Sequence, residues 1–240
     1  NQWKVLEYEL SSFVCEGEYE QGLQRILDSY LRHRGSATQP AVWVSGFYGS
    51  GKSHLVRVLQ HLWADTAFPN RASARGLTNL PQSIRDQLTE LDTLGKRDGA
   101  APWSAAGALD RSGDSLNAVF LAIVLGAAGL PTRVEPAQVA LWLAGSGHLD
   151  TVRAHVEDNG GDFAEELSEY NLSTLLANAI LAADPSFASN GAEVRSALRS
   201  QFPPEARALS TDETITLFRK VLQYVGGGAI PPTLIVLDEV

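Results

Sequence analysis

The sequence predicts an α/β fold, in which a parallel sheet is flanked by helices and a largely helical insertion separates two parts of the sheet. Three observations lead to this prediction. A glycine-rich loop lies between a short apolar run and a helical pattern, and a second apolar run ends in two acidic residues. The third is spacing, because 186 positions separate Lys52 from Asp238, more than the elements of a compact sheet require.

The individual elements follow from the spacing of apolar residues. Helices are predicted where such residues recur every three or four positions, over residues 16–32, 52–63, 81–94 and 116–128. Short apolar runs bounded by turn signals predict strands, at residues 41–45, 233–237 and, more weakly, 103–106. Glycine and proline break residues 136–201 into several helices. Ser210 followed by Glu213 predicts a capping box at the start of one more helix.

Composition limits the classes of function. The chain is 44% hydrophobic and 20% charged, which is typical of a globular domain, and it has no apolar run long enough to span a membrane. The formal net charge is −9, and the basic stripe that is typical of nucleic-acid-binding domains is not evident. A single cysteine, Cys15, and the lack of a signal-peptide pattern favour a cytoplasmic protein.

The two ends of the sequence predict that residues 1–240 are the N-terminal part of an ATPase domain in a longer protein. Methionine is absent, the first residue is Asn1, and Val240 falls inside an apolar strand signal. A folded domain rarely stops in the middle of a strand.

The glycine-rich loop fits the pattern G-x-x-x-x-G-K-[ST], the Walker A motif. Glycines allow backbone N–H groups to approach a triphosphate, and the helix that follows directs its N-terminus at the phosphates. Lys52 is expected to reach the β- and γ-phosphates, and the Ser53 hydroxyl to bind Mg²⁺. His54 has two interpretations, a contact to nucleotide or helix packing. The predicted nucleotide-binding residues are Gly46, Phe47, Tyr48, Gly49, Ser50, Gly51, Lys52, Ser53 and His54.

The second apolar run ends in Asp238 and Glu239, the arrangement of a Walker B motif. A buried parallel strand delivers its last residue to the edge of the sheet where ligands bind. Asp238 is therefore a predicted Mg²⁺ ligand, and Glu239 a predicted general base that activates water. Because a kinase transfers phosphate to a substrate hydroxyl, Glu239 favours ATP hydrolysis over phosphoryl transfer to a metabolite.

The region between the two motifs is predicted to contain the insertion, at about residues 107–204. A partner-binding module and a structural spacer are both compatible with its helical pattern.

Three stretches of the sequence resemble the large ATPases of bacteriophage-exclusion (BREX/Pgl) systems, of the BrxC/PglY type. They are residues 13–19 (FVCEGEY), 42–55 (VWVSGFYGSGKSHL) and 234–240 (LIVLDEV). The resemblance implies an AAA+-like ATPase that uses ATP and Mg²⁺ in antiphage defence and couples the nucleotide cycle to conformational change. It places residues before the first strand beside the adenine, with Glu16, Glu18 and Glu20 near the nucleotide entrance. Acidic residues at a positive helix start are an equally good explanation of these glutamates.

The resemblance also implies partners and missing parts. Other defence-system proteins and a homo-oligomer are the expected partners, while DNA contact is left to the full protein. The sensor residue and the arginines that reach the γ-phosphate are expected beyond Val240, so residues 1–240 alone should hydrolyse ATP slowly or not at all. Two alternatives remain open: a DNA-loading AAA+ ATPase similar to replication initiators, and a nucleotide-switch scaffold with little turnover.

Overall fold

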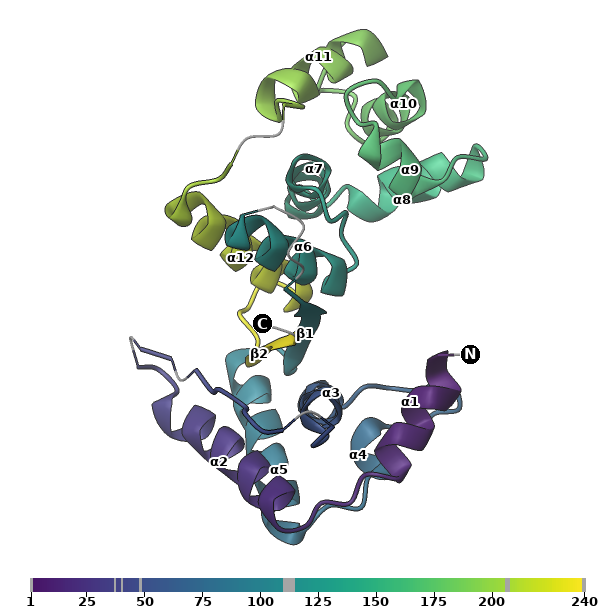
Figure 1. The fold of residues 1–240 in the computed structure, drawn as a ribbon. Helices are drawn as coiled ribbons and strands as arrows, with labels where there is room; N and C mark the ends of the chain where they lie inside the picture. Colours follow the sequence, from purple (N-terminus) through teal and green to yellow (C-terminus); the bar gives the residue numbers. More distant parts are fainter. Residues whose placement is uncertain are drawn as a thin grey trace. The chain divides into compact units, whose positions relative to one another are not determined.

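The structure, a computed structural model, describes residues 2–36, 38–39, 41–47, 49–109, 115–205 and 208–238 (Figure 1). Its contacts divide the chain into two compact units. Unit 1 comprises residues 1–108 and 229–240, and unit 2 comprises residues 109–228. The insertion predicted at about residues 107–204 falls in unit 2 except for its first two residues; that it is an insertion stays a prediction.

Unit 1 contains five helices and two strands among the described residues. They are α1 (Gln2–Ser11), α2 (Glu18–His33), α3 (Lys52–Ala64), α4 (Ala74–Leu77), α5 (Gln82–Asp98), β1 (Trp103–Ala108) and β2 (Thr233–Asp238). Helix α2 packs on α5, and α1 packs on α4. The helices predicted at residues 16–32, 52–63 and 81–94 and the strand predicted at residues 233–237 are confirmed as α2, α3, α5 and β2.

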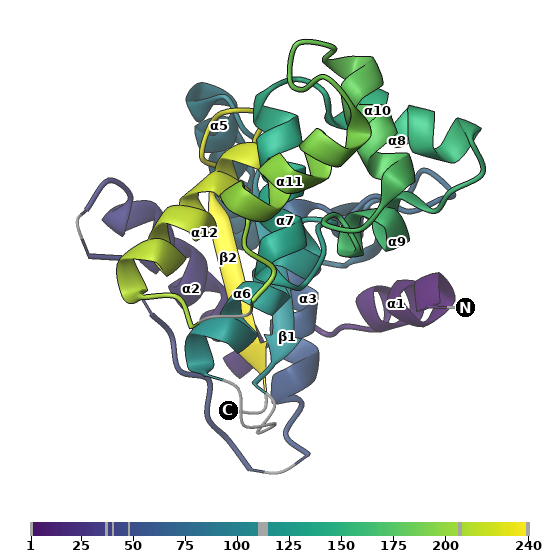
Figure 2. The same cartoon turned by 90° about the horizontal axis from the view of Figure 1, so that it is seen from above.

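The sheet of unit 1 consists of β1 and β2, which lie parallel and in register from Trp103 opposite Thr233 to Ala108 opposite Asp238. Helix α3 packs on both strands, as Figure 2 shows. Two hydrogen bonds fix this packing: the Ser104 hydroxyl donates to the Gln60 carbonyl at 3.0 Å, and the Trp63 indole N–H donates to the Pro232 carbonyl at 3.1 Å. Both bonds join the C-terminal half of α3 to the amino ends of the two strands.

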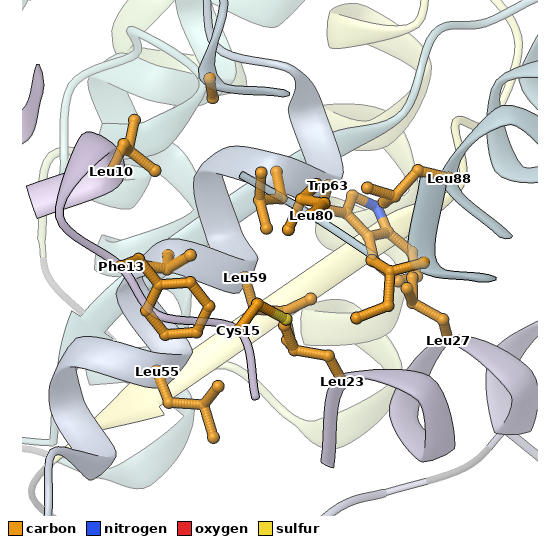
Figure 3. Close-up of a cluster of buried hydrophobic side chains, with 14 of the residues drawn as sticks. Leu10, Phe13, Cys15, Leu23, Leu27, Leu55, Leu59, Trp63, Leu80 and Leu88 are labelled. Carbon is orange, nitrogen blue, oxygen red and sulfur yellow. The ribbon is translucent and has the colours of Figure 1, made fainter. Parts of the chain in front are cut away.

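A hydrophobic core joins α2, α3 and α5 (Figure 3). Leu23 and Leu27 of α2, Leu59 and Trp63 of α3, and Leu88 of α5 are each at most 3% exposed. The buried residues of α3 and α5 recur at spacings of three and four and those of α2 at a spacing of four, so one apolar face of each helix is buried. The Cys15 side chain lies within the same cluster (Figure 3).

The described secondary-structure elements of unit 2 are all helices. Its helices are α6 (Leu116–Ala127), α7 (Val134–Gly145), α8 (Leu149–Asp158), α9 (Phe163–Ser168), α10 (Thr174–Ala183), α11 (Gly191–Gln201) and α12 (Thr211–Val225). Helix α10 packs against α8, α9 and α11, and α12 packs against α6 and α7. The capping box predicted at Ser210 and Glu213 is confirmed at the start of α12.

The predicted fold class, a P-loop NTPase sheet of the AAA+ type flanked by helices, is wrong for this structure. The described residues are mainly helical and form one sheet with two strands. Residues 41–45, predicted as a buried strand, are not a strand, and Val42 and Trp43 are 53% and 77% exposed. An apolar run becomes a strand only when a neighbouring backbone pairs with it, and in the described sheet β1 and β2 pair with each other.

Within the described part of the chain, no helix combines the length and the apolar character needed to cross a membrane.

Candidate functional site

The glycine-rich loop of unit 1, residues 46–51, follows a segment without regular secondary structure and ends at the first residue of α3. The loop begins with a turn in which the Ser50 N–H donates to the Phe47 carbonyl at 3.1 Å. Gly49 and Gly51 have φ angles of +77° and +80°, which side chains rarely adopt. The loop geometry therefore requires glycine at two positions of the predicted motif. Tyr48 lies outside the described residues.

Lys52, the first residue of α3, folds back over this loop. Its ammonium group donates to the carbonyl oxygens of Gly46 and Phe47, both at 2.9 Å. An ammonium has three N–H donors, so it can keep both loop carbonyls and still donate to an anion at the loop. The charge of Lys52 is thus held at the loop by the backbone itself.

The N-terminus of α3 lies directly after Gly51, its N-cap residue. Within the described residues this cap makes no side-chain hydrogen bond to the first turn. The first backbone N–H groups of a helix have no partner within the helix, and the helix dipole adds partial positive charge. Together with Lys52, this helix start offers the kind of donors that bind phosphate.

Ser53 and Asp238 are brought together although they are 185 positions apart. The Ser53 hydroxyl lies 3.3 Å from one carboxylate oxygen of Asp238, at hydrogen-bonding distance. The parallel register of β1 and β2 positions Asp238 at the end of β2, and α3 packs on both strands. Thus the two residues predicted as Mg²⁺ ligands converge, whereas Glu239 lies outside the described residues.

The Ser53 hydroxyl and the Asp238 carboxylate fit a magnesium ion that is bound together with phosphate. Two neighbouring ligands of an octahedral Mg²⁺ ion lie roughly 3 Å apart, close to the observed separation of 3.3 Å. The described residues contain no cluster of three or more His, Cys, Asp or Glu that could hold a metal. That is compatible with Mg²⁺, which keeps several waters and binds through one or two protein oxygens plus phosphates.

Aromatic side chains lie beside the loop on the side of α2. The Phe13 ring centroid is 5.8 Å from that of Tyr19 and 5.5 Å from that of His54. The structure therefore shows His54 in a packing contact, which leaves the predicted nucleotide contact untested. The Tyr19 hydroxyl donates to the Ser50 carbonyl of the loop at 2.7 Å. Tyr19 is not among the site residues predicted from the sequence; the only signal for it was its place in residues 13–19, one of the three stretches of the resemblance.

The glutamates before and within α2 are partly explained by the helix. Glu18 and Glu20 lie in its first turn, where negative charge is favourable.

Burial, and to a smaller extent the charge of Glu20, raises the pKa of the Cys15 thiol to about 11. Cys15 is therefore a protonated core residue at neutral pH and a poor nucleophile.

Unit 2 contains a large open cavity of about 960 Å³. Polar and aromatic side chains from α7 and α12, together with Phe202, line it, including Gln138, Trp142, Lys220 and Tyr224. None of the predicted site residues belongs to this lining.

In comparisons with known proteins, no family model and no solved structure matches this chain.

Proposed function

We propose that unit 1 binds ATP with Mg²⁺ and supports its hydrolysis. The contact between Ser53 and Asp238 is the observation that carries this proposal. A hydroxyl directly after a glycine-rich loop and a carboxylate at the end of a parallel strand are the two magnesium ligands that phosphate-loop ATPases use. The packing of α3 on β1 and β2 brings these two residues, 185 positions apart in the sequence, together at the start of α3.

The phosphates would be held by the backbone of the loop, the start of α3 and Lys52. Lys52 supplies the positive charge, and Gly49 and Gly51 let the backbone take conformations closed to other residues. When bound, Mg²⁺ would neutralise phosphate charge, and Ser53 and Asp238 are the residues that would hold it. Hydrolysis would further require Glu239 to orient water and accept its proton, a role that rests on the sequence alone.

The first test is nucleotide binding to the Lys52→Ala variant. Removing a charged donor from a phosphate site should weaken binding of Mg-ATP by roughly ten- to a hundredfold. Lys96→Ala is the matched control, since Lys96 is an exposed lysine at the end of α5, also in unit 1. Isothermal titration of both variants and the unaltered chain measures the effect. Equal affinity of the two variants would refute the site.

Hydrolysis is tested separately with the Glu239→Gln variant. The variant should bind ATP normally and lose turnover, because an amide cannot accept the proton of the attacking water. Unchanged turnover would refute the role of Glu239 and leave nucleotide binding intact.

The setting of this ATPase, in our proposal, is defence against bacteriophages, where the nucleotide cycle drives conformational change in a larger complex. The support is the resemblance of residues 13–19, 42–55 and 234–240. Phage plating efficiency on cells with the intact gene and with Lys52→Ala tests the proposal. Loss of protection at unchanged protein level is expected, and unchanged protection would remove the defence role.

A further inference from the structure

Tyr19 connects α2 to the glycine-rich loop by a hydrogen bond over 31 positions of sequence. Its hydroxyl donates to the Ser50 carbonyl at 2.7 Å, while its ring packs against the Phe13 ring and the core of unit 1. The ring is fixed by packing, so the hydroxyl is held at a defined place beside the loop. This contact is not required for the packing of the ring, which a phenylalanine could provide equally well.

The hydrogen bond determines the orientation of one peptide group of the loop. In a trans peptide the carbonyl and the following N–H point in opposite directions, and none of the described peptide bonds is cis. Because Tyr19 holds the Ser50 carbonyl toward α2, the N–H of Gly51 points away from α2. A loop that binds phosphate needs its N–H groups turned inward to the ligand and its carbonyls turned outward.

Gly51 makes this arrangement possible. Its φ of +80° excludes most other residues, and a methyl group at this position would collide with the Tyr19 hydroxyl. The close approach of the two residues and the left-handed backbone therefore belong to the same feature.

We propose that Tyr19 is a positioning residue that orients the Ser50–Gly51 peptide so that the Gly51 N–H is ready to bind a phosphate group. The inference rests on the proposed function, since it concerns the same loop. It adds that α2, through one hydroxyl, sets the affinity of the loop for phosphate. Tyr19 itself acts through the loop backbone.

Tyr19→Phe tests this proposal, because it removes the hydroxyl and keeps the ring. Tyr30→Phe is the matched control. The Tyr30 ring packs edge-on against Trp63, with the ring centroids 4.8 Å apart. The Tyr30 oxygen forms a hydrogen bond with the backbone of Thr233, away from the loop. Affinities for Mg-ATP and for inorganic tripolyphosphate are measured for both variants and for the unaltered chain. Loss of one hydrogen bond predicts a roughly five- to tenfold weaker binding of both ligands to Tyr19→Phe, with Tyr30→Phe unchanged.

Tripolyphosphate separates positioning of the loop from a contact to the base, because it has no base. A drop for Mg-ATP alone would overturn the inference, as would tighter binding, which would show that the contact opposes the bound loop. A second readout is the ¹⁵N-resolved amide resonance of Gly51, which tripolyphosphate should shift in the unaltered chain and much less in Tyr19→Phe.

The failures of the two proposals can be told apart. If the unaltered chain binds phosphate ligands and Tyr19→Phe binds them equally well, the role of Tyr19 is refuted and the nucleotide site stands. If the unaltered chain binds neither ligand, or Lys52→Ala binds as well as Lys96→Ala, the proposed function fails and the inference with it.

Discussion

The two units differ in how their helices begin. In unit 2, side chains of Ser, Asp or Asn accept a hydrogen bond from the first turn of most helices, namely Ser115, Asp162, Ser173, Asn190 and Ser210. In unit 1, α2 and α3 begin at Gly17 and Gly51, which within the described residues supply no such side-chain bond. A side-chain cap stabilises a helix by satisfying its orphan N–H groups, whereas a glycine start leaves them for another partner.

Side-chain caps stabilise most helices of unit 2, whereas the start of α3 in unit 1 offers its N–H groups to an anion. Unit 2 has 15 of the 28 acidic residues and 8 of the 19 basic residues, so it carries most of the net negative charge. Five of its seven described helices begin at a residue whose side chain caps the first turn. Unit 1 holds the uncapped start of α3 beside Lys52, the combination that favours an anion. We therefore expect phosphate ligands to affect unit 1.

We expect the largest effect, a loss in the free energy of unfolding, from one substitution in the hydrophobic core of each unit. Trp63 is 1% exposed in unit 1 and Leu143 is fully buried in unit 2. Trp63→Ala should lower the free energy of unfolding of unit 1 by roughly 3–5 kcal/mol, because it leaves a cavity and the Pro232 carbonyl without its donor. Leu143→Ala should cost unit 2 roughly 2–5 kcal/mol.

Hydrogen exchange followed by mass spectrometry measures each unit separately. Trp63→Ala should accelerate exchange in α2, α3 and α5, and Leu143→Ala in the helices of unit 2. If each variant accelerates exchange equally in both units, the chain unfolds as one body and the comparison between units fails.

The sequence predicted local features of both units and failed on pairing. Helix α3 and the capping box of α12 were predictable because their signals, apolar spacing and a Ser-x-x-Glu pattern, lie within a few residues. The strand expected at residues 41–45 was wrong because strand formation depends on a partner elsewhere in the chain. In the same way, the sequence named Ser53 and Asp238, but only the structure shows that they meet. The sequence also gave no signal that the Tyr19 hydroxyl contacts the Ser50 carbonyl, beyond the place of Tyr19 in residues 13–19.

The next largest effect is expected on the alkylation rate of Cys15, the single cysteine, which lies in unit 1. Its pKa is raised from 9.0 to about 11 because burial disfavours the charged thiolate. At neutral pH, the fraction of Cys15 present as thiolate is then about a hundredfold lower than for a thiol with the ordinary pKa. A more basic thiolate is a better nucleophile, which offsets part of this loss. Alkylation of Cys15 should therefore be at least about tenfold slower than that of an ordinary thiol.

The pH dependence of the alkylation rate tests whether the pKa of Cys15 is raised. The rate should keep rising about tenfold per pH unit up to pH 11 in the folded chain, whereas the chain in urea should level off near pH 9. Trp63→Ala should accelerate the reaction and Leu143→Ala should not. A folded chain whose rate levels off near pH 9 would contradict the burial of Cys15.

The smallest effect tests the capping difference itself. Ser210 accepts from the Glu213 N–H, and the Glu213 carboxylate accepts from the Ser210 N–H at 2.9 Å, so Ser210→Ala removes half of the capping box. The loss should be about 1 kcal/mol in unit 2, and Thr216→Ala, at an exposed position in the middle of α12, should change little. Faster hydrogen exchange confined to α12 in Ser210→Ala is the expected result.

Since tripolyphosphate would bind at the start of α3, it should leave this exchange unchanged and slow exchange in the first turn of α3. Slowing in α12 instead would show that the ligand acts on the capped helices, contrary to the division of roles between the two units.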